Sequence, residues 1–214
     1  MTTQTNPDHS PEVSELPISP PPAPEARYQA IPFTITPERD HILQHILDNM
    51  ITFETMFTDY QKNDNTRRAS IAASLTKLDS VTWEVWELEN QLPVDLVGIL
   101  HLSDIVPGQD AVAHYVFFDG DLRGKTTLLQ RVLDWVFEDH PEAGWHNLQH
   151  LTLTIPDYTY ALARHAQHYL GFGGQFTYKT GGKTIKVEGV KENAISWRGE
   201  PRHLIIMGKT NAPA

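Results

Sequence analysis

The hydrophobic pattern of the chain changes period at Val81, and this change limits the folds that the chain can adopt. Beyond it, short stretches rich in β-branched and aromatic residues replace the helical spacing that precedes it, which is typical of strands. Turn-forming residues at Asn90–Pro93 and Pro107–Gly108 separate these stretches. The pattern predicts a three-stranded antiparallel meander, formed by Trp83–Glu89, Leu96–Leu102 and Ala111–Phe118.

Helical periodicity precedes the meander. Thr36 followed by Pro37 is typical of a helix start. The Thr hydroxyl can cap the first turn, and proline is tolerated there because a first-turn N–H has no acceptor within the helix. Apolar residues then recur at helical spacing from Ile42 to Phe57, which predicts a first helix ending before residue 63. A second, shorter helix is predicted over Ala69–Leu78.

The remaining elements follow from the same two periods. A short strand is predicted at the start of the folded region, at Ile31–Ile35. The elements expected after the meander are a helix at Gly124–Glu138, a strand at Leu148–Ile155, a helix at Asp157–Leu170, two hairpin strands at Gln175–Tyr178 and Thr184–Glu188, and a last strand at His203–Met207. A meander that leads into alternating strands and helices predicts an α/β (α+β) fold with a central, mostly antiparallel mixed sheet flanked by helices.

The first 30 residues have a different composition from the rest. They hold seven of the 15 prolines and few apolar residues. Such a segment cannot bury enough surface to offset the entropy lost on ordering, so a disordered or extended tail is expected. The sequence therefore predicts a Pro-rich acidic tail over 1–30, suited to protein assembly contacts, and one folded domain over 31–214.

Charge and composition exclude several classes of protein. Lys and Arg number 17 against 27 Asp and Glu, a formal net charge of −10, so nucleic acid is not an expected partner. The absence of Cys excludes thiolate catalysis and Cys-ligated metals, and it suits a reducing cytoplasm. No apolar run reaches the roughly 18 residues that a membrane helix needs, so no membrane contact is expected.

The stretch from His114 to Leu128 carries the clearest functional signal: a strand, a glycine-containing polar turn and then a helix. The free N–H groups at such a helix start favour a phosphate or pyrophosphate. A nucleoside triphosphatase loop would need a further glycine five residues before Gly124, and Asp119 stands there. The carboxylate would repel a triphosphate, so this interpretation is disfavoured.

Two segments resemble the GNAT superfamily of acyl-CoA-dependent N-acyltransferases. Asp119–Lys125 resembles its pyrophosphate-binding region, and the helix that ends in Leu170-Gly171-Phe172 resembles its later helix ending in Leu-Gly-Phe. The resemblance covers roughly residues 31–209 and is similar to the divergent GNAT-like proteins of bacteriophages, with Trp135 in the intervening helix. It implies a GNAT-like fold, acetyl-CoA as cofactor, and a cytoplasmic or virion location.

The resemblance also implies a site. It assigns acetyl-CoA binding to backbone and side chains of Tyr115, Val116, Arg123, Gly124, Lys125, Thr126 and Thr127. Acyl transfer needs a base for the amine of a small molecule or protein, and the candidates are His114 and His150, on strands expected to be neighbours. The superfamily often places a general-acid Tyr where this chain has Gln167, and this departure motivates an alternative: a catalytically inactive GNAT-fold structural or interaction module, as in a phage particle.

Other histidine patterns compete with this interpretation. His101-Leu-Ser103 and His150-Leu-Thr152 resemble the paired motif of two-histidine phosphoesterases, in which one His acts as base and the other as acid. His165 and His168 are three residues apart on one predicted helix, and His41 and His45 are four apart on another. Neither helical pair has a carboxylate at a recognisable ligand spacing, so no metal site is expected.

Overall fold

The computed structural model describes residues 27–52, 63–122 and 124–211. The first half of the fold comprises β1 (Tyr28–Pro32), the 3₁₀ turn η1 (Pro37–Arg39), α1 (Asp40–Thr52), α2 (Asp64–Leu75), β2 (Val81–Glu89), β3 (Leu92–Val106) and β4 (Asp110–Phe117). The second half comprises α3 (Thr126–Val136), η3 (Pro141–Ala143), β5 (His150–Pro156), η4 (Asp157–Thr159), α4 (Tyr160–Leu170), β6 (Phe176–Thr180), β7 (Lys183–Val187), β8 (Gly189–Trp197) and β9 (Glu200–Thr210).

Seven strands form one sheet in the order β1-β2-β3-β4-β5-β9-β8. All neighbouring pairs are antiparallel except β4 and β5, which are parallel. The predicted mixed sheet and its three-stranded meander are therefore confirmed. A separate β6–β7 hairpin turns at the predicted glycine pair Gly181-Gly182.

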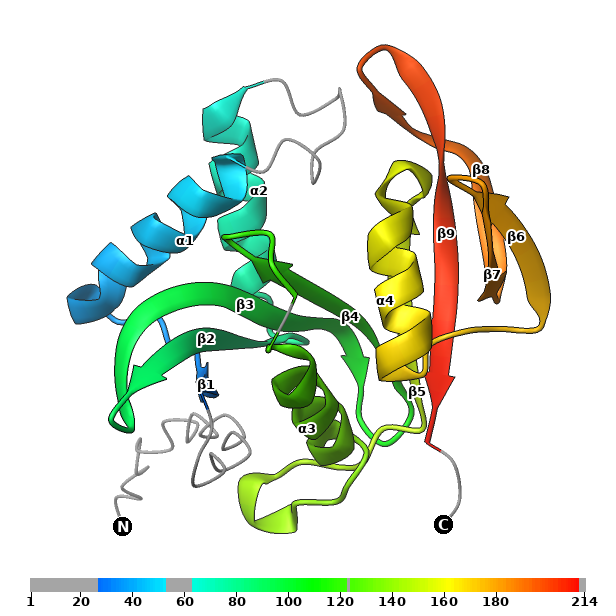
Figure 1. The fold of residues 1–214 in the computed structure, drawn as a ribbon. Helices are drawn as coiled ribbons and strands as arrows, with labels where there is room; N and C mark the ends of the chain where they lie inside the picture. The colour runs from blue at the N-terminus through cyan, green and yellow to red at the C-terminus, as the bar shows by residue number, and fades with distance from the viewer. Residues whose placement is uncertain (1–26, 53–62, 123, 212–214) are drawn as a thin grey trace, which may run out of the picture.

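Helices cover both faces of the sheet (Figure 1). On one face α3 and α4 pack onto a large apolar cluster that includes Trp83, Leu151 and Ile205. On the other face α1 and α2 pack onto a smaller cluster around Ile46 and Ile99. The strands contribute side chains to both clusters, since successive residues of a strand point to opposite faces.

Several strands and helices begin or end at residues other than the predicted ones. Strand β1 begins at Tyr28, so Tyr28–Ala30, which composition assigned to the tail, pair with β2 instead. The Tyr28 side chain is buried, which explains why this end of the tail is ordered. Helix α2 begins at Asp64 rather than Ala69, capped by the Asn63 side chain. The rest of the predicted tail, and the predicted end of the first helix beyond residue 52, lie outside the described residues.

The sequence pattern underestimated the length and the number of the C-terminal strands. The predicted last strand, His203–Met207, is the centre of an 11-residue strand, and β8 was not predicted at all. Most β8 residues are exposed or half-buried, so this edge strand lacks the apolar alternation that reveals strands in a sequence. Among the described residues, no helix is long and apolar enough to cross a membrane.

Candidate functional site

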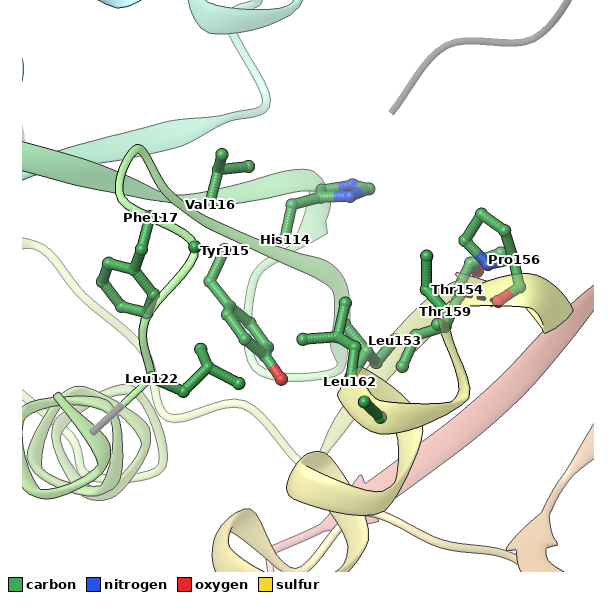
Figure 2. A pocket seen from close by; sticks show the side chains of 13 residues that line it. His114, Tyr115, Val116, Phe117, Leu122, Leu153, Thr154, Pro156, Thr159 and Leu162 are labelled. Carbon is green, nitrogen blue, oxygen red and sulfur yellow. Dashed lines mark hydrogen bonds between the residues drawn. The ribbon is translucent and has the colours of Figure 1, made fainter. Parts of the chain in front are cut away.

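The parallel strands β4 and β5 pair over only part of their length. The paired register runs from Asp110 opposite His150 to Ala113 opposite Leu153 and then ends, although both strands continue. The separated ends border a cavity of about 510 Å³ (Figure 2). Its lining residues are His114, Tyr115, Val116, Phe117, Gly120, Leu122, Leu153, Thr154, Ile155, Pro156, Thr159, Ala161 and Leu162, and we call this cavity the cleft.

The backbone of β4 presents N–H groups to the cleft. Phe118 N donates to Val97 O on β3 at 2.9 Å, which fixes the direction of the neighbouring groups because they alternate along a strand. The N–H of Val116 therefore points to β3, whereas that of Tyr115 points to the side where β5 has separated. Of the two amides proposed from the sequence, only that of Tyr115 faces the cleft.

His114 and Tyr115 direct their side chains to opposite faces of the sheet. Tyr115 packs against the apolar cluster under α3 and α4. Its even-numbered neighbour Val116 packs against the cluster under α1 and α2, and His114 has the same parity. Figure 2 shows the two side chains leaving the strand on different sides of the opening.

The His114 imidazole is exposed to the cleft on one side and contacts polar groups on another. Its Nε2 lies 3.4 Å from Ser103 Oγ, and its ring centroid lies 5.7 Å from that of His101. Desolvation by the surrounding protein atoms lowers the pKa of His114 below its ordinary value. The ring is therefore neutral near pH 7 and can accept a proton.

His150 lies at the other end of the shared ladder. It is opposite Asp110, at the start of β5, and its Nε2 is 3.4 Å from Glu188 Oε2. His114 is four residues further along β4, where the strands have separated. The structure therefore places the two histidines on neighbouring strands, as predicted, but does not bring them together.

The structure does not bring the histidines of the competing patterns together into a site. His101 is opposite His114 on β3, and β4 separates it from the strand of His150. The His101 ring is buried, with Nδ1 2.8 Å from Thr82 Oγ1 and Nε2 3.3 Å from Ser74 Oγ. The part of the chain that the structure describes contains no group of three metal-ligating side chains.

The loop between β4 and α3 is closed by an ion pair between a buried lysine and a partly exposed aspartate. Lys125 is 1% exposed, and its Nζ donates to both carboxylate oxygens of Asp119, at 2.6 and 2.8 Å, and to Asp121 O at 2.7 Å. The same ammonium lies over the rings of Tyr28 and Phe117. Lys125 therefore points into the protein, and its charge is already matched by Asp119. Arg123, the other predicted cation of this loop, lies outside the described residues.

The start of α3 offers backbone N–H donors that lie outside the intrahelical ladder. The first helical bond runs from Leu129 N to Lys125 O, so the N–H groups of Thr126, Thr127 and Leu128 precede the intrahelical ladder. Leu128 is buried in the core, and Thr127 is exposed. Gly124 has a φ of 75°, a conformation that favours glycine and that leads the chain into the helix. This helix start can therefore hold an anion through its amides.

The structure also shows surroundings of polar groups that the sequence did not predict. The Tyr115 hydroxyl is buried and has no hydrogen-bond partner among the described residues, and burial raises its pKa above the ordinary value. Gln167, at the position of the superfamily's acid, accepts a hydrogen bond from Lys186 N at 2.6 Å. His165 Nε2 lies 3.1 Å from Thr126 Oγ1 and links α4 to the start of α3. A sequence pattern does not reveal these contacts, because each joins elements far apart in the chain.

No protein-family model matches the sequence, and no curated protein matches it significantly. Solved structures do resemble the fold. Spermidine N-acetyltransferase from Vibrio cholerae, in complex with CoA and spermine, has a TM-score of 0.57 at 13% identity, covering 86% of this chain and 96% of that chain. A probable GNAT-family acetyltransferase from Chromobacterium violaceum has a TM-score of 0.57 at 14% identity, covering 98% of both chains.

These similarities show the fold. The chain has the GNAT fold, with a mostly antiparallel mixed sheet between helices, and the predicted fold class is confirmed. The likeness is to bacterial acetyltransferases, and nothing in it supports the bacteriophage subtype that the sequence resemblance suggested.

Proposed function

We propose that this protein is an acyl-CoA-dependent N-acyltransferase, which moves an acetyl group from acetyl-CoA to an amine. The observation that carries the proposal is the break between β4 and β5, where the backbone N–H of Tyr115, beyond the end of the ladder, and a neutral imidazole lie beside one cleft. The similar Vibrio cholerae enzyme was solved with CoA and spermine, which supports a thioester donor and an amine acceptor for this chain.

The cofactor would be held between the cleft and the start of α3. The amides of Thr126 and Thr127 and the glycine conformation at Gly124 suit a pyrophosphate, and the buried Leu128 side chain does not cover them. Lys125 contributes by closing the loop through Asp119 rather than by contacting phosphate. Arg123, by its place in the sequence, would add a cation at the same loop.

Two groups of the chain would act on the reacting atoms. His114 accepts a proton from the amine, so that the nitrogen lone pair can attack the thioester carbonyl. The Tyr115 N–H donates to the carbonyl oxygen as it gains negative charge. The C–N bond forms, the C–S bond breaks, and the thiolate leaves with the bonding electrons and takes up the second proton that the nitrogen of the ammonium loses.

The two faces of the sheet separate the substrates in this proposal. His114 lies on the α1/α2 side, so the acceptor amine would approach from that side. The acyl donor would lie on the α3/α4 side, next to the helix start that holds its phosphates. The acceptor is the amine of a small molecule or of a protein.

Calorimetric titration with acetyl-CoA, followed by acetyl transfer to a panel of primary amines, tests the proposal. Binding below millimolar concentration and acetylation of at least one amine are expected. Absence of heat at millimolar acetyl-CoA, in a protein whose circular dichroism shows that it is folded, would overturn it.

A GNAT-fold interaction module without catalysis is the second candidate. Two observations favour it. Gln167 stands where the superfamily often has an acid, and its side chain accepts a hydrogen bond from Lys186 N of β7. Lys125 points to Asp119 and away from the loop surface. Such a module, including a virion component that uses the predicted N-terminal tail to contact a partner, would co-purify with a larger assembly. Amine acetylation by the isolated protein would exclude this candidate.

A further inference from the structure

Beside the cleft, three side chains form a hydrogen-bonded chain that ends on His114. Ser103 Oγ donates to Asp104 Oδ2 at 3.2 Å and lies 3.4 Å from His114 Nε2. Asp104 in turn accepts from Lys77 Nζ at 2.6 Å. Ser103 is buried, whereas Asp104 and Lys77 are exposed, so the chain runs from the cleft to the protein surface.

A β-bulge creates this arrangement. The β3–β4 register shifts between Ser103 and Val106, and Asp104 has a φ of 52°, in the left-handed region. In a regular strand, Ser103 and Asp104 would point to opposite faces, and their side chains would not meet. The bulge turns the carboxylate back onto the Ser103 hydroxyl, and bulges that redirect a side chain in this way are common next to active sites.

The direction of the bonds fixes the tautomer of His114. Ser103 has one hydroxyl proton, and it donates that proton to Asp104, so its oxygen must accept from the imidazole. Nε2 therefore carries the proton of the neutral ring, and Nδ1 is the basic nitrogen. The 3.4 Å contact is long, but catalytic hydrogen bonds often shorten only when substrate is bound.

We propose that Ser103 and Asp104 are positioning residues that hold His114 with Nδ1 as the base, and that stabilise the imidazolium formed when the amine loses its proton. The inference rests on the proposed function for the identity of the reaction, but the tautomer is a property of the protein alone. The amine N–H bond breaks, an Nδ1–H bond forms, and the positive charge faces Asp104 through Ser103.

The charged and titratable groups facing His114 favour this role. Its strand neighbour His101 is neutral, because burial and His114 lower its pKa to about 4. The hydrogen bond from Lys77, together with that from Ser103, holds the pKa of Asp104 below its ordinary value, so this carboxylate is ionised at neutral pH. The Asp104 charge raises the pKa of His114 against the larger effect of desolvation.

The test compares Ser103→Ala and Asp104→Asn with a matched control, Asp79→Asn. Asp79 also accepts from Lys77, at 3.3 Å, but takes no part in the bonded chain to His114. Asparagine tolerates the left-handed backbone conformation at position 104, so the variant can keep the bulge. Nitrogen-15 NMR of labelled histidine reads the tautomer and pKa of His114 in all three variants and in the wild type.

The wild type is expected to show the Nε2–H tautomer, and both test variants are expected to show mixed tautomers and a lower His114 pKa. In Asp104→Asn, the acidic limb of the pH profile of kcat/KM should shift to lower pH. At pH 7, kcat/KM should fall about tenfold. Removal of a general base is expected to lower it more, by roughly 100-fold or greater. Asp79→Asn should match the wild type. An Nδ1–H tautomer in the wild type, or test variants identical to the control, would overturn the inference. Failure of acetyl-CoA binding would instead remove the proposed function and leave the tautomer readable.

Discussion

The Nζ atom of Lys125 lies 2.6 Å from Asp119 Oδ2, yet the two side chains differ sharply in exposure: 1% for Lys125 and 51% for Asp119. Burial pushes the pKa of Asp119 upward, but hydrogen bonds from Lys125 and from Asp121 N outweigh it and hold that pKa below its ordinary value. The pair closes the loop that leads into α3.

This difference in exposure predicts unequal losses of stability. Asp119→Asn leaves a buried ammonium without its counter-ion and is expected to cost about 3 kcal/mol. Lys125→Met leaves a carboxylate that water can reach and fills the same space, so the loss should be about 1 kcal/mol. Urea unfolding of the two variants measures this. A Lys125→Met loss as large as that of Asp119→Asn would contradict the assigned burial.

The two candidate bases predict different kinetic effects. His114→Gln should lower kcat/KM for acetyl transfer by about 100-fold or more, because the amine loses its proton acceptor, while the dissociation constant of acetyl-CoA is unchanged. His150→Gln is the matched control and should retain activity, since His150 lies opposite Asp110 at the far end of the ladder. Steady-state kinetics with calorimetry distinguish them. The reverse ranking would assign the base to His150.

Removal of one hydroxyl is expected to stabilise the protein. Within the part of the chain that the structure describes, the buried Tyr115 hydroxyl has no partner, and an unsatisfied buried polar group costs roughly 1–3 kcal/mol. Tyr115→Phe should therefore raise the free energy of unfolding by about 1 kcal/mol. Tyr169→Phe, at a position 60% exposed, should change it little. A destabilised Tyr115→Phe would mean that the hydroxyl has a partner, such as a bound water.

Stability is expected to fall as the pH is lowered through the titration range of His101. Burial lowers its folded-state pKa to about 4, against an ordinary value of 6.5, so between these values the unfolded chain binds a proton that the folded protein does not. The contribution is complete above pH 6.5 and is lost as the pH falls toward 4, by about 3 kcal/mol. Urea unfolding across this range should show a flatter profile for His101→Gln, but not for the exposed-site control His168→Gln.

Alanine variants at two glycines with similar φ angles can distinguish an effect on loop strain from an effect on ligand binding. Gly124 has a φ of 75° and Gly182 a φ of 71°, so Gly→Ala at either position should cost about 1 kcal/mol of stability. An added Cβ at Gly124 would lie 3.4 Å from Tyr28 Cε2, whereas at Gly182 it would meet nothing within 4 Å. Only Gly124→Ala should weaken acetyl-CoA binding, by several-fold in calorimetry. Equal affinities of the two variants would place the cofactor elsewhere.

Most of the fold could be predicted from local patterns. The turns at Asn90–Pro93 and Pro107–Gly108 delimit the meander, and the amphipathic stripes of α3 and α4 identify those helices, because each signal depends on residues close in sequence. Strand β8 could not be predicted, since its pairing with β9 is stabilised by backbone hydrogen bonds and leaves most of its side chains exposed or half-buried.

With the exception of β8, the sequence alone determined the order of the strands and helices. It also determined the glycine turn before α3 and the choice of His114 as a candidate base. Only the tertiary structure decided that β4 and β5 separate after Ala113 and Leu153, that Lys125 points inward, and that Asp104 turns back onto Ser103. Periodicity reports which face of an element is apolar, because that depends on near neighbours along the chain. Where two strands part, and which polar atoms then meet, depends on tertiary packing, which brings together residues distant in sequence.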